Sequence, residues 1–432
     1  MSFDAHAYLR TRVDIEAQAG RAVGLSIDPI KTALEALGRP QEDLHAIHVT
    51  GTNGKGSVAE MATRLLLAAG LRVGTYISPD LGRPADRIKI DGEGVSDDEF
   101  ADALEAVSWA EEASGAKLSK FESLTAAAFR VFSDEAVDAA VVEVGMLGTF
   151  DATNVIDADV AVVTNIGRDH TDGRGDWRRA VATEKLGISK DRSTLLFGER
   201  DPVLREVAEA TPARARWYRD EDFGCERNRV AVGGRVVDLR TPEATYDDLL
   251  IPVHGAHQAD NASIALASVE AFFGRPLGDE VVRAAFEAIS LPGRFEVVGR
   301  QPTVIIDGAH NIDGARTVAA TIRDEMTLHG SLIFVVGLLR GRDPVEMLEA
   351  LGAGDAAIVV ACTPPSPRAI PSTALAAAAT SMGLVAEAVN HPAEALRRAR
   401  DIATDDDLIV AVGSLSLVGP LRAAAKDLEI AS

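Results

Sequence analysis

Residues 48–57 read HVTGTNGKGS, and this stretch decides the fold. The apolar residues 46–50 predict a buried strand, and residues 58–69 combine helix-forming residues with apolar side chains at helical spacing. A strand, a glycine-rich turn and a helix in this order are the layout of a phosphate-binding loop. The glycines let the backbone approach phosphates closely, and the start of the helix offers unpaired N–H groups.

Two side chains of this loop have the chemistry that a nucleotide needs. The Lys55 ammonium can neutralise phosphate oxygens, and the Ser57 hydroxyl can bind Mg²⁺. Gly56 separates them, which departs from the usual G-x-x-x-x-G-K-[ST] spacing. The alternative is a glycine turn that only ends a strand, and it accounts for neither side chain. The residues that we expect to bind ATP here are Gly51, Thr52, Asn53, Gly54, Lys55, Gly56 and Ser57.

The composition limits the possible partners and compartment. The 432 residues are enough for two or three domains, and the 44 basic and 66 acidic residues give a formal charge of −22. This charge speaks against a nucleic-acid or anionic-membrane partner. The two cysteines, Cys225 and Cys362, cannot form a disulfide framework or a zinc pattern. No apolar signal core or membrane span is recognisable, so we expect a cytoplasmic protein.

Strands alternate with helices along the chain, which predicts a doubly wound, mostly parallel α/β sheet of P-loop type. The further strands expected in this sheet cover residues 72–78, 138–144 and 159–166. The expected helices cover residues 4–17, 30–37, 121–132, 177–188, 257–273 and 279–289. Residues 194–239 contain short strand-like segments around Gly233 and Gly234, and they predict a small β excursion.

The sequence Leu291-Pro292-Gly293-Arg294 predicts a domain boundary, because the strand–helix pattern restarts after it. We therefore expect one domain over residues 1–292 and a second, smaller, Rossmann-like α/β domain over residues 293–432. The strands expected in the second domain cover residues 303–307, 332–337, 357–361 and 408–412, and the helices cover residues 314–325, 345–351, 372–381 and 393–402.

Three polar residues, Ser57, Glu143 and His170, lie at or just after the carboxyl ends of predicted strands. In an open α/β sheet these ends share the ligand-binding edge. Glu143 alone could be a capping carboxylate, and His170 alone a hydrogen-bonded loop histidine. Together with a phosphate loop, a hydroxyl, a carboxylate and an imidazole predict a site for Mg²⁺ bound to ATP phosphates.

A series of collinear segments resembles the Mur ligase superfamily, and within it the folylpolyglutamate and dihydrofolate synthases. These segments are GTNGKGS (51–57), FESLTA (121–126), EVG (143–145), DATN (151–154), TNIG (164–167), DHT (169–171), EKLGI (184–188), HGAHQ (254–258), LPGR (291–294), DGAHN (307–311) and GSL (413–415). The resemblance runs from about residue 48 to residue 419. It implies an ATP-dependent amide-bond ligase with an ATP-binding domain and an amino-acid-binding domain.

The resemblance also implies roles around the phosphates. Lys55 would bind the β- and γ-phosphates and act in catalysis. Ser57 and Glu143 would hold one Mg²⁺, and His170 with Glu143 would help hold a second. Lys185 stands where family members carry a carbamylated lysine, because CO₂ converts an ammonium that cannot bind a cation into a carboxylate that can. The alternative for Lys185 is an exposed helix lysine.

Further roles follow from the same resemblance. The implied nucleotide contacts outside the loop are Asn261, Arg294 and Asp307. His310 would act in catalysis beside the γ-phosphate and an acyl phosphate. The residues that fall where the superfamily binds the incoming amino acid are Arg342, Asp343 and Ser414. In the implied reaction, ATP phosphorylates a substrate carboxylate and the amine of L-glutamate displaces the phosphate.

The acyl substrate implied by the resemblance is a folate or dihydropteroate. The residues expected to line its site are Asp80, Phe121, Thr149 and Asp151. Several positions here depart from the family: Asp80 replaces a histidine, Thr149 replaces an arginine and Ser123 replaces a common phenylalanine. Two alternatives therefore stand beside a folate ligase, namely a related ligase for another carboxylate and a non-catalytic nucleotide-binding module. We expect a monomer that acts on small molecules.

Overall fold

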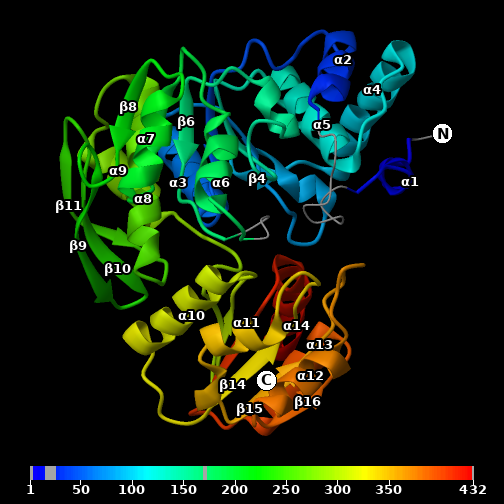
Figure 1. The fold of residues 1–432 in the computed structure, drawn as a ribbon, viewed down its shortest axis with the longest axis vertical. Coiled ribbons are helices and arrows are strands. Elements are labelled where there is room, and N and C mark those ends of the chain that lie inside the picture. Colours follow the sequence, from blue (N-terminus) through cyan, green and yellow to red (C-terminus); the bar gives the residue numbers. More distant parts are fainter. Residues whose placement is uncertain (1–2, 15–25, 169–172, 431–432) are drawn as a thin grey trace. The chain divides into compact units, whose positions relative to one another are not determined.

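The computed structural model describes residues 3–14, 26–168 and 173–430 (Figure 1). The chain divides into two compact units between Ile289 and Ser290, close to the boundary predicted at residue 292. The segments Val230–Arg235 and Pro252–His257 belong to the second unit.

The first unit is built on an eight-stranded sheet with the order β4-β3-β2-β5-β1-β6-β7-β8. The strands are β1 (Ala46–Thr50), β2 (Val73–Tyr76), β3 (Ile88–Ile90), β4 (Glu93–Gly94), β5 (Ala139–Glu143), β6 (Val160–Val163), β7 (Thr194–Phe197) and β8 (Ala215–Tyr218). The six strands from β2 to β8 in this order are parallel, and β3 and β4 add an antiparallel edge. The predicted fold class is confirmed, and the central strands are buried apolar runs, as a parallel sheet requires.

Helices cover both faces of this sheet. The helices are α1 (Ala5–Arg10), α2 (Asp28–Ala36), α3 (Lys55–Ala68), α4 (Asp97–Ser114), α5 (Lys120–Asp134), α6 (Trp177–Leu186), α7 (Pro202–Ala210), α8 (His257–Phe273) and α9 (Asp279–Glu287), with single turns η2 (Pro84–Arg87) and η3 (Ala152–Val155). The chain moves one way along the sheet from β1 to β2 and the other way from β2 to β5. Right-handed crossovers therefore place α3 on one face and α4 and α5 on the other.

The prediction of a β excursion over residues 194–239 is wrong for its first half. Strands β7 and β8 extend the main sheet, and helix α7 lies between them. Pro202 occupies the first turn of α7, where a missing N–H costs nothing, and Asp201 caps the helix by accepting from Val203 N at 2.9 Å. The excursion is a separate sheet of β9 (Gly224–Ala231), β10 (Gly234–Arg240) and β11 (Thr245–Ile251), with Gly233 in the predicted hairpin turn at φ +79°.

The second unit contains a six-stranded sheet with the order β12-β13-β17-β14-β15-β16. Its strands are β12 (Glu296–Arg300), β13 (Thr303–Ile306), β14 (Leu332–Val336), β15 (Ile358–Ala361), β16 (Ala386–Ala388) and β17 (Leu408–Val412). Its helices are α10 (Ile312–Glu325), α11 (Pro344–Ala350), α12 (Ser372–Ser381), α13 (Pro392–Ile402) and α14 (Val418–Ile430), with turns η4 (Ala353–Asp355) and η5 (Leu415–Leu417). Only β12 is antiparallel to its neighbour.

A buried carboxylate joins three segments of the second unit that are distant in sequence. The Glu325 side chain at the end of α10 is 1% exposed and forms an ion pair with Arg235. It also accepts hydrogen bonds from Gly255 N at 2.8 Å and His254 Nδ1 at 2.9 Å. These bonds explain why the segments Val230–Arg235 and Pro252–His257 belong to this unit.

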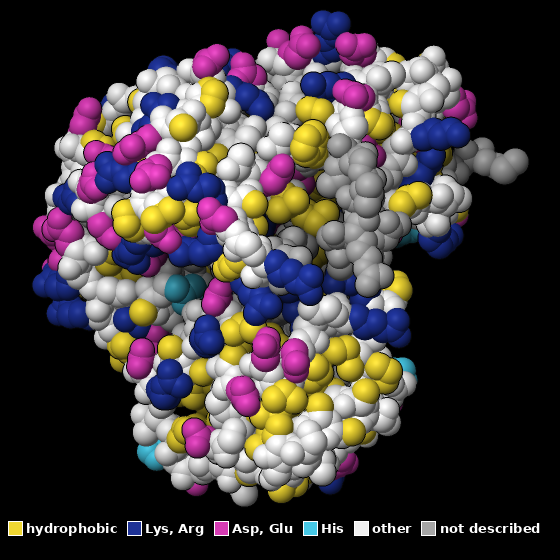
Figure 2. Space-filling view, viewed as in Figure 1, with side chains coloured by type: hydrophobic (Ala, Val, Ile, Leu, Met, Phe, Trp, Pro, Cys, Tyr) yellow, Lys and Arg dark blue, Asp and Glu magenta, His cyan; other side chains and the backbone are white. Residues whose placement is uncertain are grey.

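Charged residues of both signs are interspersed on the face drawn in Figure 2. Ion pairs between side chains of opposite charge include Arg227 with Asp238, at 2.7 Å. Among the residues that the structure describes, no helix is both long and apolar enough to cross a membrane. The two cysteines lie in different units, with Cys225 on β9 and Cys362 directly after β15, and neither forms a disulfide.

Candidate active site

The topology of the first sheet brings three strand ends together. Strand β1 is central, and the chain turns to β2 on one side before it adds β6 on the other, which makes β1 the switch point where ligands bind in open α/β sheets. Strand β1 pairs with β5 so that Val49 lies beside Glu143, and with β6 so that Thr50 lies beside Val163. The segments that follow β5, β1 and β6 therefore meet at one edge.

The phosphate loop contains two glycines that no other residue could replace without a clash. Gly51 has φ +148°, and a Cβ there would lie 1.8 Å from Thr164 Oγ1. Gly54 has φ +85°, and a Cβ there would lie 2.5 Å from Asn261 Oδ1. Helix α3 begins at Lys55, earlier than the predicted residue 58, so Lys55 to Ser57 form its first turn. The N–H groups of this turn have no partner earlier in the helix, which suits a phosphate.

Two lysines converge on one backbone oxygen of this loop. Lys55 Nζ lies 3.1 Å from the Gly51 carbonyl oxygen, and Lys185 Nζ lies 2.8 Å from the same atom. Lys185 is 4% exposed and comes from helix α6, more than a hundred residues further along the chain. The alternative of an exposed helix lysine is therefore wrong. Two basic side chains therefore meet at this loop, where phosphate oxygens would need a counter-charge.

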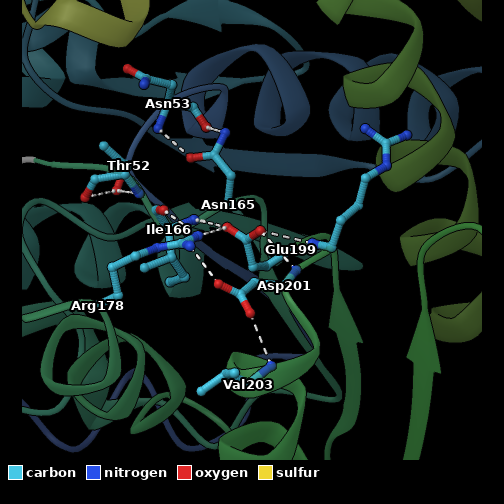
Figure 3. Close-up of polar contacts among 10 residues, drawn as sticks. Thr52, Asn53, Asn165, Ile166, Arg178, Glu199, Asp201 and Val203 are labelled. Carbon is cyan, nitrogen blue, oxygen red and sulfur yellow. Dashed lines mark hydrogen bonds and ion pairs between the residues drawn. The ribbon is translucent and has the colours of Figure 1, made fainter. Parts of the chain in front are cut away.

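The segment after β6 holds the loop from the other side (Figure 3). Asn165 accepts from Thr52 N at 3.0 Å through its carbonyl and from Asn53 N at 2.9 Å through Oδ1. Gly167 N donates to Thr52 Oγ1 at 2.9 Å, and Thr164 Oγ1 donates to the Asn53 carbonyl at 2.7 Å. These bonds fix the backbone of the loop at the residues that precede Lys55.

Two of the predicted metal ligands are buried at this edge. Ser57 is 2% exposed and Glu143 is 4% exposed, and Glu143 Oε2 accepts from Ser78 N at 3.1 Å. Of the other two, Lys185 is the buried lysine described above, and His170 lies outside the described residues. Within the described ranges, no group of three His, Cys, Asp or Glu side chains could hold a metal ion. One hydroxyl and one carboxylate still fit Mg²⁺, which usually takes one or two protein oxygens and completes its shell with water and phosphate.

Two of the predicted acyl-side residues make contacts that constrain their roles. Asp80 is paired with Arg87, whose Nε lies 2.9 Å away and whose side chain is 3% exposed. The carboxylate that replaces the family's histidine is therefore balanced by a buried cation. Phe121 is 8% exposed and lies against Gly145, where a Cβ would be 2.4 Å from Phe121 Cζ. A glycine is thus required for the backbone to pass the ring.

The other two acyl-side residues hold the loop after β5. Thr149 donates to the Glu184 carbonyl from its backbone N at 2.9 Å and from Oγ1 at 3.1 Å, which ties this loop to α6 next to Lys185. Asp151 accepts from Met146 N at 2.8 Å and from Thr153 Oγ1 at 2.6 Å. Burial raises the pKa of Asp151, although these hydrogen bonds act in the opposite direction.

His48 was missed by the sequence reasoning, although it belongs to the opening stretch. Thr153 Oγ1 donates to Asp151, so it must accept from His48 Nε2, which lies 2.8 Å away. His48 Nδ1 is buried and has no hydrogen-bond partner among the described residues. Burial, reinforced by the nearby charge of Lys190, lowers the pKa of His48 to about 3. The imidazole is therefore neutral and links β1 to the loop after β5.

The second unit has its own cluster of predicted residues at the ends of the adjacent strands β13, β17 and β14. Asp307 follows β13 and accepts from Phe295 N and Ala309 N, both at 2.7 Å. Burial raises the pKa of Asp307, and the charge of Arg294 opposes this shift. His310 Nδ1 lies 3.0 Å from the Gly308 carbonyl, so this nitrogen carries the hydrogen.

The predicted amino-acid-binding residues follow the neighbouring two strands. Ser414 comes directly after β17, is 2% exposed and caps η5 by accepting from Ser416 N at 3.3 Å. Asp343 caps α11 by accepting from Val345 N at 2.8 Å, and Arg342 precedes it in the loop after β14. Asn261 belongs to the first unit, because it lies on α8 beside Gly54 and donates to Gln258 Oε1 at 2.9 Å.

Known protein families match both units. Residues 49–269 match the family described as Mur ligase middle domain, and residues 293–415 match the family described as Mur ligase, glutamate ligase domain. The chain is 41% identical over 403 residues to a dihydrofolate synthase/folylpolyglutamate synthase of Mycobacterium tuberculosis, in an alignment that covers 88% of this chain and 82% of that protein.

Solved structures give the same result for the fold. A Mycobacterium tuberculosis folylpolyglutamate synthase complexed with ADP and AMPPCP is similar with a TM-score of 0.88 and 36% identity, over 98% of this chain and 99% of that one. A bifunctional folylpolyglutamate synthase/dihydrofolate synthase with Mn, AMPPNP and L-glutamate bound is similar with a TM-score of 0.84 and 29% identity, over 99% of this chain and 100% of that one.

Proposed function

Since the chain belongs to the Mur ligase family of folylpolyglutamate and dihydrofolate synthases, we propose that it joins L-glutamate to the carboxylate of a folate or dihydropteroate. It is an ATP-dependent ligase that forms an amide bond. The observation that carries the proposal is the convergence of Lys55 and Lys185 on the Gly51 carbonyl, beside the buried Ser57 and Glu143.

In the proposed reaction, the substrate carboxylate attacks the γ-phosphorus of ATP and ADP leaves, which gives an acyl phosphate. The amine of glutamate then adds to the acyl carbon, and the tetrahedral intermediate collapses to the amide and releases phosphate. The chain contributes charge and orientation rather than covalent chemistry. Lys55 and the N–H groups at the start of α3 would hold the phosphates, and Thr52 and Asn53 are held in place by the segment after β6.

The ligase would bind a divalent cation together with the nucleotide, as the relative with Mn and AMPPNP bound does. Mg²⁺ would neutralise the phosphate oxygens, and we propose two ions, one on Ser57 and Glu143 and one on Glu143 and His170. We also propose that Lys185 becomes carbamylated: its neutral amine would form an N–C bond to CO₂ and release a proton, and the resulting carboxylate would be an oxygen ligand. The burial of Lys185 and its place beside the loop support this assignment.

The second unit would supply the amino-acid site. Ser414 and Arg342, which follow adjacent strands, would bind the glutamate carboxylate, and Arg294 with His310 would contact the transferred phosphoryl group. The alternative substrate, a carboxylate unrelated to folate, was suggested by the departures from the family at Asp80, Thr149 and Ser123. The ion pair between Asp80 and Arg87 balances the charge that the first of these departures introduces. We propose that the chain acts as a monomer.

The test is to incubate the protein with Mg²⁺-ATP, L-glutamate and either 7,8-dihydropteroate or tetrahydrofolate. We expect ADP release and a product heavier by one glutamyl residue in mass spectrometry. Lys55→Ala should be slower by about 10²–10³-fold, a typical cost of losing one charge-stabilising group. Lys31→Ala, which changes an exposed lysine of α2, is the matched control. ATP turnover without a folate product, or full activity of Lys55→Ala, would contradict the proposal.

A further inference from the structure

Glu199 lies in the loop after β7, and the proposed reaction does not use it (Figure 3). Its side chain is 13% exposed. Oε2 accepts from Ile166 N at 2.9 Å, and Oε1 accepts from Arg200 N at 2.8 Å and Asp201 N at 3.1 Å. Both oxygens are therefore occupied by backbone N–H groups, which fixes the carboxylate and through it the backbone at Ile166.

Ile166 is the middle residue of the segment that forms hydrogen bonds with the phosphate loop. Asn165 on one side accepts from Thr52 N at 3.0 Å and from Asn53 N at 2.9 Å. Gly167 on the other side donates to Thr52 Oγ1 at 2.9 Å. We call residues 165–167 the strand-end clamp. The hydrogen bond from Ile166 to Glu199 is the anchor of this clamp on the neighbouring strand, so a shift of Glu199 would be transmitted to the loop.

Arg178 connects the same carboxylate to helix α6. One of its guanidinium nitrogens lies 3.4 Å from Glu199 Oε2 and 3.5 Å from the Ile166 carbonyl, and the other pairs with Asp201. Arg178 and Lys185 are seven residues apart on α6, which is about two helical turns, so they lie on the same face. The contacts of Arg178 therefore help to fix the rotation of α6 that brings Lys185 Nζ to the Gly51 carbonyl.

We propose that Glu199 is a positioning residue for the nucleotide site, which it shapes through the strand-end clamp and, by way of Arg178, through the placement of Lys185. This inference deepens the proposed function and rests on its nucleotide site, but not on the identity of the acyl substrate. The clamp binds the N–H groups of Thr52 and Asn53 and so fixes the backbone that leads into Gly54 and the first turn of α3, whose N–H groups can bind phosphates. A change at Glu199 should therefore weaken nucleotide binding although Glu199 touches no nucleotide.

The experiment compares the equilibrium binding of a fluorescent N-methylanthraniloyl-ADP with Mg²⁺ by wild-type protein and variants. Glu199→Gln keeps the shape of the side chain but removes the charge that three N–H groups and Arg178 share. We expect its Kd to rise by about tenfold or more, the equivalent of one hydrogen bond to a charged group. Glu206→Gln is the matched control, because Glu206 is exposed and pairs with the adjacent Arg179 of α6 at 3.2 Å without touching the clamp.

A second variant separates the effect of Glu199 on the strand-end clamp from its effect on Lys185 through Arg178. Arg178→Gln leaves the bond between Glu199 and Ile166 intact, so it should raise Kd less than Glu199→Gln while lowering kcat, because Lys185 loses its orientation. Urea unfolding of all variants shows whether a change in Kd or kcat follows only from a loss of stability. The proposal is overturned if the Kd of Glu199→Gln for the ADP probe lies within about twofold of the Kd of Glu206→Gln.

The result also distinguishes this inference from the proposed function. If the wild-type protein ligates no folate while Glu199→Gln still weakens binding of the ADP probe, the positioning role stands and the proposed substrate is wrong. If the wild-type protein ligates folate and Glu199→Gln binds the probe normally, the proposed substrate stands and the positioning role is wrong.

Discussion

At the residue scale, the candidate site contains charged side chains that are buried. Lys185 is the clearest case: it is 4% exposed, and its ammonium lies 2.8 Å from the Gly51 carbonyl. Burial of an ammonium away from water is costly. The burial of Lys185 therefore supports a role for this side chain in the site.

Lys185→Ala should lose most of the ligase activity, because the second cation would lose the oxygen ligand that the proposed carbamate provides. Added acetate should restore part of the activity, since a free carboxylate can enter the cavity left by the lysine but lacks its orientation. The measurement is ADP release in acetate and in chloride at equal ionic strength. Normal turnover by Lys185→Ala would show that the carbamate assignment is wrong.

His48 predicts a pH dependence of stability. Its pKa is lowered from the ordinary 6.5 to about 3. Between these values the unfolded chain binds a proton on His48 that the folded chain does not. Stability should therefore decrease as pH falls from 6.5 towards 3, by up to about 1.4 kcal/mol per pH unit from this group. His48→Gln, which keeps a donor for Thr153, should lack this component in urea unfolding at pH 7.5 and 5.5. Equal losses of stability in the wild-type protein and in His48→Gln between pH 7.5 and 5.5 would contradict this prediction.

The sequence reveals some of these residues and hides others for a physical reason. Lys55 and Glu143 stand in motifs of fixed spacing, and the structure brings both to the expected edge. Glu199 and Arg178 act through backbone groups of Ile166, in the segment after β6, and nothing in the sequence next to Glu199 or Arg178 shows this. The sequence signal for Glu199 is only that a carboxylate follows the strand beside β6. The roles of the individual site residues remain predictions.

At the element scale, the phosphate loop allows a test of steric fit. Gly51→Ala should destabilise the chain by more than about 2 kcal/mol and abolish nucleotide binding, because the new Cβ would lie 1.8 Å from Thr164 Oγ1. Gly70→Ala is the control: Gly70 also has a positive φ, +88°, but no atom lies within 4 Å of the point that a Cβ would occupy. It should cost only about 1 kcal/mol of backbone strain. Equal losses in urea unfolding would refute the steric explanation.

The elements themselves were predictable where burial imposes a pattern. Strands β1 and β17 have the predicted bounds, because both are buried apolar runs in the middle of parallel sheets. Strands β12 and β16 were missed because they lie at sheet edges, where half-exposed residues give no apolar run. Helix α7 was missed because it is short and its Pro202 suggests a break, although proline suits the first turn.

At the scale of the whole molecule, the fold class, the family and the ligase activity predicted from the sequence are confirmed by the two sheets and by the similar proteins. The sequence could not predict that the segments Val230–Arg235 and Pro252–His257 belong to the second unit. That assignment depends on Glu325, Arg235 and His254 meeting in space across long sequence separations, and no local pattern encodes such a meeting.

The contacts of Glu325 lead to a prediction for the second unit. Burial alone would raise the pKa of Glu325, but the hydrogen bond from His254, the Gly255 N–H and the charge of Arg235 lower it. The stabilisation is therefore present above the ordinary pKa of 4.5 and is lost as pH falls through the lower folded value. Glu325→Ala should cost about 3–5 kcal/mol, because the buried Arg235 guanidinium would lose this carboxylate and the buried N–H groups would lose their acceptor.

The measurement for Glu325→Ala is urea unfolding followed by a probe in each unit, since the two units can unfold in separate transitions. The transition of the second unit should move to lower urea, and that of the first should not. Asp313→Ala, which removes an exposed ion pair of α10 with Arg316, is the control. An unchanged second transition in Glu325→Ala would show that the buried pair contributes nothing.

The two cysteines make the molecule convenient for single-dye labelling. The thiolate is the form that reacts with a maleimide, and burial raises the pKa of Cys362 to about 12, so this thiol is inert at neutral pH. Cys225, half-buried on β9 in the first unit, is the thiol that a maleimide dye should modify. One engineered cysteine on the exposed surface of the second unit would then complete a donor–acceptor pair. Energy transfer between the two dyes could follow the distance between the units during turnover.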